Sequence, residues 1–189
     1  GPSLLVKLDD DAIAVRCARC QASAIHLSIL QVLPRVCSGL SAMAVYEMSS
    51  RGPLFKFLGS RVSKLVCSEF YDDVAPGSFK YGVQCQDVQR LTFDDASFDL
   101  CTSTEVFEHV PDDRKGFAEI RRVLRPGGRF VFTVPLTQAE KTVERARLVD
   151  GQVQHLLEPE YLAYMLRHDS VHGKFKGEIS VSGTTLIVN

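Results

Sequence analysis

Several short apolar segments of the chain end in polar residues whose types suit ligand binding. Glu47, Glu69 and Asp87 each close such a segment, and the run Ser103-Thr104-Glu105 closes a fourth. Glu69 lies 22 residues after Glu47, close to the ~20-residue offset at which an acid reaches the ribose of a bound nucleotide. A carboxylate suits that task because it can accept from both ribose hydroxyls at once. Any one acid could simply be a solvated loop residue, but three in succession favour a shared ligand site.

A second group of chemically active residues follows directly, in the pattern Glu105-x-x-Glu108-His109. Spacings of three and four would place these side chains on one face of a helix. The unperturbed pKa of a histidine lies near neutrality, so His109 could remove a proton from a substrate, and Glu105 could orient it. The competing interpretation is a helix start, at which the dipole favours acids and His109 hydrogen-bonds locally.

The segments that would position these residues alternate between strand-like and helix-like patterns. Apolar runs predict strands over Ala42–Met48, Lys64–Ser68, Tyr81–Cys85, Phe98–Thr102 and Arg129–Val134. Helical periodicity predicts helices over 22–33, 54–58 and 113–124. This order predicts an α/β fold: a Rossmann-like, doubly wound, mostly parallel sheet with helices on both faces. Ligands bind such sheets outside the carboxyl ends of the strands, where the polar residues lie.

Two of these helices have clear boundary signals. The first is expected to end near Pro34, because proline breaks the helical hydrogen-bond ladder. In the third, Asp112 or Asp113 is expected to cap the first turn, and Pro126-Gly127-Gly128 to stop the helix. Its buried stripe is predicted to consist of Phe117, Ile120, Val123 and Leu124.

Composition narrows the function classes. The chain has 189 residues, 45% of them hydrophobic, and a net charge of −1, which excludes a disordered chain and gives no reason to expect nucleic-acid binding. No run approaches the roughly 18 apolar residues of a membrane span. The six cysteines do not form a disulfide framework, so a reducing cytoplasm is expected. We expect residues 1–3 to be a tag remnant and 4–189 a single domain.

Three motifs in order identify a resemblance to a family. They are Gln86–Leu100, then Thr-Glu-Val-Phe-Glu-His-Val-Pro-Asp over 104–112, then Val-Leu-Arg-Pro-Gly-Gly-Arg-Phe over 123–130. Together they resemble class I S-adenosylmethionine-dependent methyltransferases, in particular the small-molecule, type 11-like branch. The resemblance covers roughly residues 43–136. It implies a cofactor-binding core over 42–136, preceded by a helical extension (4–41) and followed by a substrate-side cap (137–189).

The resemblance also implies a role for each polar strand end. It assigns Glu69 to the ribose hydroxyls of S-adenosylmethionine and Phe70 to the face of the adenine. Asp87 would accept from the adenine amino group, with Val88 packed near the ring. Ser103 and Thr104 would line the crevice beside the sulfonium.

The loop after the first strand departs from the family. Glu47 and the turn Ser49, Ser50, Arg51, Gly52 would lie at the methionine end of the cofactor, where relatives usually carry a glycine-rich turn. Glycine is favoured there because the backbone approaches the ligand closely. The serines are small enough to fit. Arg51 is bulky, and its charge could meet the carboxylate of the cofactor or point to solvent, so cofactor binding is expected to be weakened.

The C-terminal part departs as well. Gln138–Val149 is predicted to be helical, and Phe175–Val181 with Thr185–Val188 could form an abbreviated terminal hairpin. Only 54 residues follow Pro135, so a partner chain could supply part of the substrate wall, as in a homodimer.

Two motifs raise the question of a metal. Cys17-x-x-Cys20 followed by His26 is similar to half of a zinc ribbon, but tetrahedral zinc needs four ligands, so we favour a metal-free role. Glu105, Glu108 and His109, with His155 as a fourth ligand, resemble the divalent-metal site of some O-methyltransferases. We favour the metal-free interpretation here too.

The function implied is methyl transfer to an oxygen, nitrogen or carbon atom of a small molecule, with His109 taking the proton and Glu105 orienting it. Three alternatives stay open. They are a non-catalytic domain that has lost cofactor binding, an enzyme whose cofactor is not a methyl donor, and a metal-assisted O-methyltransferase.

Overall fold

A six-stranded sheet forms the centre of the computed structural model, which describes residues 4–7, 15–135, 144, 146–150 and 152–156. The strand order is β5-β6-β4-β3-β7-β8. All neighbours pair in parallel except β5 and β6, which pair antiparallel. The strands are β3 (Ala44–Glu47), β4 (Lys64–Glu69), β5 (Phe79–Lys80), β6 (Val83–Cys85), β7 (Phe98–Thr104) and β8 (Leu124–Thr133).

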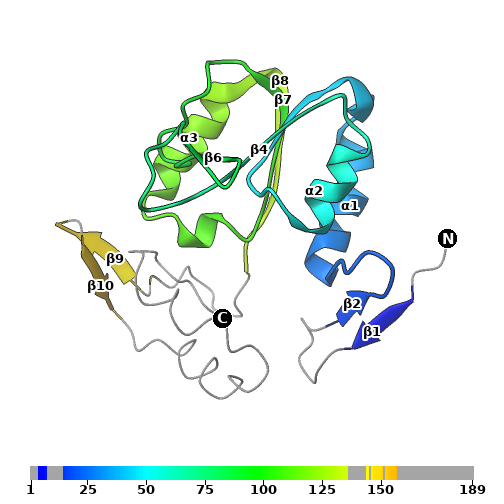
Figure 1. Ribbon diagram of the computed structural model, residues 1–189, viewed down its shortest axis with the longest axis horizontal. Helices are drawn as coiled ribbons and strands as arrows, with labels where there is room; N and C mark the ends of the chain where they lie inside the picture. The colour runs from blue at the N-terminus through cyan, green and yellow to red at the C-terminus, as the bar shows by residue number, and fades with distance from the viewer. Residues whose placement is uncertain (1–3, 8–14, 136–143, 145, 151, 157–189) are drawn as a thin grey trace.

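Helices cover both faces of this sheet, as Figure 1 shows: α1 (Ala24–Val36) and α2 (Gly52–Gly59) lie on one side and α3 (Asp113–Val123) on the other. Alternation along β3 divides the core accordingly. Val45 packs in the cluster that contains residues of α1 and α2, whereas Tyr46 packs in the cluster that contains residues of α3. The predicted doubly wound α/β fold is confirmed.

The N-terminal end of α1 is fixed by a capping box. Ser23 accepts a hydrogen bond from the His26 backbone N–H, and the His26 ring accepts from the Ser23 N–H. The predicted end near Pro34 is wrong, because the helix continues to Val36. Proline removes only its own hydrogen bond, and the Cys37 N–H closes the last turn onto Leu33 O at 2.8 Å.

Helix α3 begins as expected, with the Asp112 carboxylate accepting from the Lys115 N–H. It ends at Val123, so Leu124 already belongs to β8. The predicted apolar stripe is correct for Ile120 and Val123, which are buried. Phe117 was expected to be buried but is 39% exposed; its ring stacks on Phe107 at 4.4 Å between centroids.

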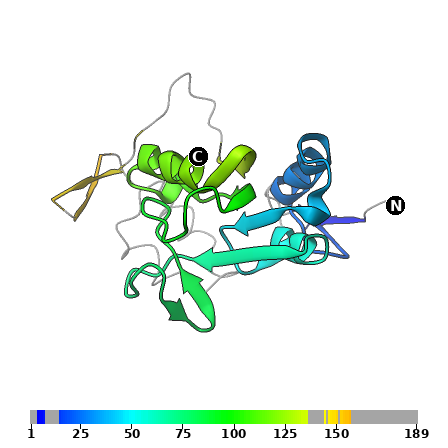
Figure 2. The same ribbon diagram turned by 90° about the horizontal axis from the view of Figure 1, so that it is seen from above.

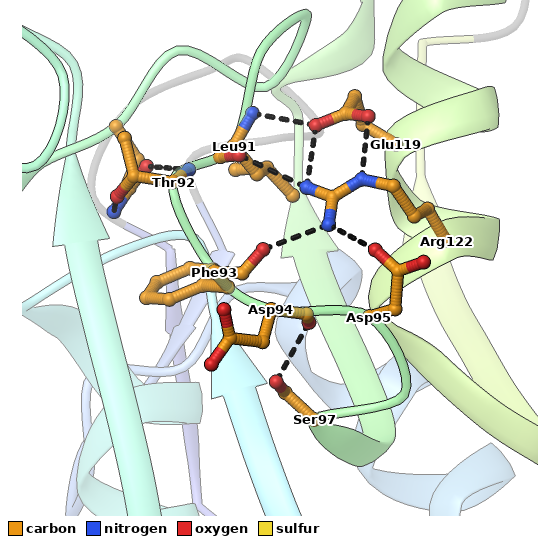
Figure 3. Close-up of polar contacts among 9 residues, drawn as sticks. Leu91, Thr92, Phe93, Asp94, Asp95, Ser97, Glu119 and Arg122 are labelled. Atoms are coloured by element: carbon orange, nitrogen blue, oxygen red, sulfur yellow. Dashed lines mark hydrogen bonds and ion pairs between the residues drawn. The ribbon is translucent and has the colours of Figure 1, made fainter.

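One arginine fastens α3 to the loop that leads into β7 (Figure 3). Arg122 donates to both carboxylate oxygens of Glu119 at 2.8 Å, and also to Leu91 O and Phe93 O. The same Glu119 carboxylate accepts from the Leu91 N–H at 2.8 Å. The loop is thereby held by charge-assisted hydrogen bonds to its backbone.

Two antiparallel hairpins lie at opposite ends of the molecule (Figure 2). The first, β1 (Leu5–Lys7) with β2 (Val15–Cys17), adds strands to the N-terminal extension that was expected to be helical. The second, β9 (Ala146–Val149) with β10 (Gln152–His155), contradicts the predicted helix over Gln138–Val149 at its C-terminal end. The predicted strands after residue 157 lie outside the described residues. None of the described helices is both long and apolar enough to cross a membrane.

Candidate active site

A pocket of about 160 Å³ opens at the carboxyl ends of β3, β4 and β6. It brings together five of the predicted site residues: Glu69, Phe70, Asp87, Val88 and His109. Parallel pairing explains this, because the ends of β4 and β6 are adjacent, with Glu69 paired to Cys85. The other lining residues are Tyr46, Met48, Ser68, Gln86, Gln89, Val106, Val110 and Pro111.

The Glu69 carboxylate is held by the loop that follows β3. Its Oε1 accepts from the Ser50 N–H at 2.9 Å and from the Ser50 hydroxyl at 2.8 Å. The Ser49 hydroxyl lies at 3.4 Å from the same oxygen and Arg51 Nε at 3.9 Å. All these contacts fall on Oε1; none of the described residues contacts Oε2 within hydrogen-bond distance.

Asp87 lies in a similarly fixed turn. Its Oδ1 accepts from the backbone N–H of Gln89 at 2.9 Å and from that residue's side-chain amide at 3.2 Å. The Gln89 amide oxygen in turn accepts from the Asp112 N–H, which links the turn to the start of α3. Both pocket acids are therefore oriented by hydrogen bonds.

Glu47 lies outside the pocket lining, and 99% of its surface is buried. The Thr102 hydroxyl donates to its carboxylate. Burial raises the pKa of Glu47 to about 8, despite the opposing effect of this hydrogen bond. Glu47 is thus protonated at neutral pH.

The loop after Glu47 contains one glycine-dependent position. Gly52 starts α2 at a φ of +89°, which side-chain-bearing residues rarely adopt. Arg51 has a φ of −149° and an 86% exposed side chain, so its bulk points to solvent rather than into the pocket.

Among the described residues, three buried side-chain atoms have no hydrogen-bond partner. They are Ser103 Oγ and Thr104 Oγ1 at the end of β7 and Glu108 Oε2 in the turn that follows it. Unpaired buried polar groups are rare because each costs about 1–3 kcal/mol. Burial also raises the pKa of Glu108 to about 7, with a further contribution from the Glu105 carboxylate.

The predicted helical face of Glu105, Glu108 and His109 is wrong. Only one 3-10 turn forms, over Phe107–His109, and Glu105 precedes it at a φ of +54°, where its N–H donates to Thr133 O. Glu108, rather than Glu105, contacts the imidazole, with its Oε1 3.9 Å from His109 Nε2. Burial lowers the pKa of His109 below its ordinary value.

One family of known proteins is similar to the part of the chain that forms this site. Residues 50–132 match the family described as a methyltransferase domain. This segment is therefore similar to a methyltransferase domain. The strand order and the acids at the carboxyl ends of β4 and β6 agree with that similarity.

Individual relatives are similar over short stretches. Eighty residues are 34% identical to a ubiquinone biosynthesis O-methyltransferase of Coxiella burnetii, covering 40% of this chain and 34% of that protein. Sixty-two residues are 44% identical to a glyceraldehyde-3-phosphate dehydrogenase of Bacteroides fragilis, covering 33% of this chain and 17% of that protein. The crystal structure of an S-adenosylmethionine dependent methyltransferase from Mesorhizobium loti has a TM-score of 0.44 and 18% identity. The match covers 70% of this chain and 64% of that chain. The chain spans about a third of the curated O-methyltransferase.

The pocket of the methyltransferase domain fits part of the family's cofactor. At about 160 Å³ it is smaller than the roughly 300 Å³ of a complete small-molecule site. Its size and the flanking Phe70 and Val88 suit a flat ring, while Glu69 Oε2 is available as an acceptor at its edge. The unpartnered hydroxyls of Ser103 and Thr104 are further polar groups that a ligand could satisfy.

Several lining residues were missed from the sequence. Tyr46 and Met48 belong to the same strand face, and the buried Tyr46 hydroxyl lies 2.7 Å from Ser68 Oγ. The alternation of β3 could have identified both, since a residue two positions from a buried strand residue shares its face. Gln89 gave no such signal, because its contacts are made with Asp87 in a turn and with the Asp112 N–H, 23 residues further along the chain.

The sequence offered two groups of candidate metal ligands, for both of which we expected a metal-free role: Cys17, Cys20 and His26, and Glu105, Glu108 and His109 with His155. Among the described ranges, no three His, Cys, Asp or Glu side chains are arranged to hold a metal ion. His26, the third member of the N-terminal motif, is engaged with Ser23 at 2.7 Å. The side chain of His155 lies outside the described residues.

Proposed function

We propose that this domain binds S-adenosylmethionine and catalyses methyl transfer to an oxygen, nitrogen or carbon atom of a small-molecule acceptor. The family assignment supports the reaction type. The observation that carries the proposal for this chain is the convergence of Glu69, Phe70, Asp87, Val88 and His109 on one pocket. The dehydrogenase match covers 17% of that enzyme and supports no second function.

The binding roles follow from side-chain chemistry. Glu69 would accept from the ribose hydroxyls, and Asp87 from the adenine amino group, because ionised carboxylates are strong acceptors. Phe70 and Val88 would pack against the adenine. The loop Ser49–Gly52 would face the methionine end, and Ser103 and Thr104 the sulfonium side. Glu47 is buried outside the pocket and is given no contact with the cofactor.

The catalytic roles rest on His109. When bound, S-adenosylmethionine supplies a methyl group activated by its positive sulfur. The lowered pKa keeps the His109 imidazole neutral at pH 7, so it can accept the proton that the acceptor loses. Glu108, at 3.9 Å, would orient the imidazole in the role first expected for Glu105. Positioning of the acceptor would provide the rest of the rate enhancement.

Calorimetric titration of the whole chain with S-adenosylhomocysteine tests the proposal. Glu69→Ala should weaken binding about 10- to 100-fold, because it removes charge-assisted hydrogen bonds worth about 1.5–3 kcal/mol. Asp73→Ala is the matched control, since Asp73 pairs with Lys80 on the exposed β5 side. Equal affinity of Glu69→Ala and the wild type would refute the ribose role.

A non-catalytic domain is the second candidate, favoured by the Ser-Ser-Arg loop. Absence of any S-adenosylhomocysteine or S-adenosylmethionine binding by the wild-type chain would establish it. Detection of S-adenosylhomocysteine as a product would exclude it, and would also exclude a cofactor that is not a methyl donor.

A further inference from the structure

We propose that the Ser50 hydroxyl competes with bound ligand for the Glu69 carboxylate and so lowers the affinity of this domain for ligands that carry a ribose diol. The inference rests on the proposed function, because it assumes that Glu69 binds the ribose. It concerns a residue at which this chain departs from the glycine-rich loop of its relatives.

The hydrogen bond from the Ser50 hydroxyl to Glu69 is of the same kind as the one that a ribose hydroxyl would make. The Ser50 hydroxyl donates to Glu69 Oε1 at 2.8 Å, as a ribose hydroxyl would. The Ser50 N–H donates to the same oxygen at 2.9 Å. Since a carboxylate oxygen offers about two lone-pair sites, these two donors fill Oε1 and leave Oε2 to a ligand.

A ribose diol that donates one hydrogen bond to each carboxylate oxygen of Glu69 therefore needs a free lone pair on Oε1. The weaker Ser49 contact at 3.4 Å adds to the crowding of that oxygen. Arg51 contributes little, because its side chain is 86% exposed and 3.9 Å away. The Ser50 hydroxyl is the group that must be displaced.

The Ser50 backbone N–H makes it possible to tell whether the Ser50 hydroxyl competes with a ligand or only orients the Glu69 carboxylate. It holds the Glu69 carboxylate from the same side as the hydroxyl, and it persists when the side chain is shortened. Removing the hydroxyl should consequently free a lone pair without releasing the carboxylate. The expected sign is a gain in affinity, whereas a purely supporting hydroxyl would give a loss.

Ser50→Ala and Ser50→Gly in the full chain test this by calorimetry with S-adenosylhomocysteine. Both should bind about threefold to tenfold more tightly than the wild type, the range of one net hydrogen bond. Ser60→Ala is the control, because the Ser60 hydroxyl also donates at 2.8 Å, but to Phe57 O at the end of α2. Its affinity should equal that of the wild type.

Competition experiments with adenosine and 2′,3′-dideoxyadenosine assign the gain to the diol. Ser50→Ala should improve adenosine binding and leave 2′,3′-dideoxyadenosine unchanged. An unchanged or weaker affinity for S-adenosylhomocysteine in both Ser50 variants overturns the inference, as does an equal gain for the two nucleosides. If neither the wild type nor the variants bind S-adenosylhomocysteine, the proposed function fails and the inference falls with it.

Discussion

Two glutamates that end neighbouring strands differ in burial and in their hydrogen-bond partners. Glu47 is buried beside Thr102, and its pKa rises to about 8. Glu69 is partly exposed and accepts from the N–H and hydroxyl of Ser50. Both were expected to contact the cofactor on the strength of residue type and position. Only Glu69 lines the pocket, whereas Glu47 is buried outside it.

The raised pKa of Glu47 predicts a pH-dependent stability. Between pH 4.5 and about 8 the unfolded chain has lost the Glu47 proton while the folded chain retains it, so the free energy of unfolding falls as pH rises through this window. Glu47→Gln mimics the protonated form and should remove that loss, on the order of 4 kcal/mol at pH 8. Urea unfolding at pH 5, 6, 7 and 8 measures it.

The difference in the free energy of unfolding between Glu47→Gln and the wild type should grow steadily with pH. Glu108, with a pKa raised to about 7, keeps part of the slope in both proteins. Parallel stability profiles would show that Glu47 is ionised in the folded state.

The lowered pKa of His109 predicts how turnover depends on pH. Its pKa is lowered by burial, so the rate should be level near neutrality and fall as the pH drops through a value below 6.5. His109→Ala should reduce kcat about a hundredfold, measured as S-adenosylhomocysteine release with the most active compound of a panel of phenols, amines and carboxylates.

The same assay separates proton removal by His109 from a metal-assisted reaction. Turnover should survive exhaustive EDTA treatment. Loss of activity that magnesium restores would instead favour the Glu105, Glu108 and His109 metal site.

At the scale of elements, the contact between α3 and the preceding loop predicts a large effect of one substitution. Arg122 is 29% exposed and binds Glu119, Asp95 and two backbone carbonyls. Arg122→Leu leaves Glu119 and those carbonyls without their donor, which should cost about 2–4 kcal/mol. Arg121→Leu, at the adjacent exposed position, should stay within about 0.5 kcal/mol. Urea denaturation measures both variants, and the comparison is valid if their m-values are equal. Equal midpoints for Arg122→Leu and Arg121→Leu would refute the prediction.

The elements themselves were largely predictable where a local pattern specifies them. Apolar runs and helical spacing are short-range signals, and they gave the parallel strands and the three helices in order. The hairpin β9–β10 was missed although Asp150-Gly151 is a hairpin turn sequence, and Asp150 adopts a φ of +51°. The sequence over Gln138–Val149 was instead predicted to be helical.

The detailed site depends on contacts that no local pattern encodes. The hydrogen bonds from Ser50 to Glu69 span 19 residues, and they follow from the parallel register of β3 and β4. The left-handed backbone of Glu105 is set by its hydrogen bond to Thr133 in β8. Residue types therefore identified the candidate acids, while the hydrogen-bond partners of each acid could be seen only in the assembled sheet.

At the scale of the whole molecule, ligand binding should be visible as stability of the entire domain. The pocket is formed by β3, β4, β6 and the turn before α3, so a ligand there binds only the folded sheet. S-adenosylhomocysteine at 100 times its Kd should add about 2.7 kcal/mol to the free energy of unfolding. For a chain of this size that corresponds to an increase in Tm of about 5–10 °C.

Thermal unfolding with increasing S-adenosylhomocysteine measures this increase, and the Glu69→Ala variant controls for specificity. Glu69→Ala should need about 10- to 100-fold more ligand for the same shift, while its Tm without ligand stays near that of the wild type, because Glu69 is partly exposed. A Tm that does not respond to ligand in the wild type would contradict cofactor binding. A shift of equal size at equal concentration in both proteins would mean that the ligand binds away from the carboxyl end of β4, because the folded sheet would then be stabilised without the Glu69 carboxylate.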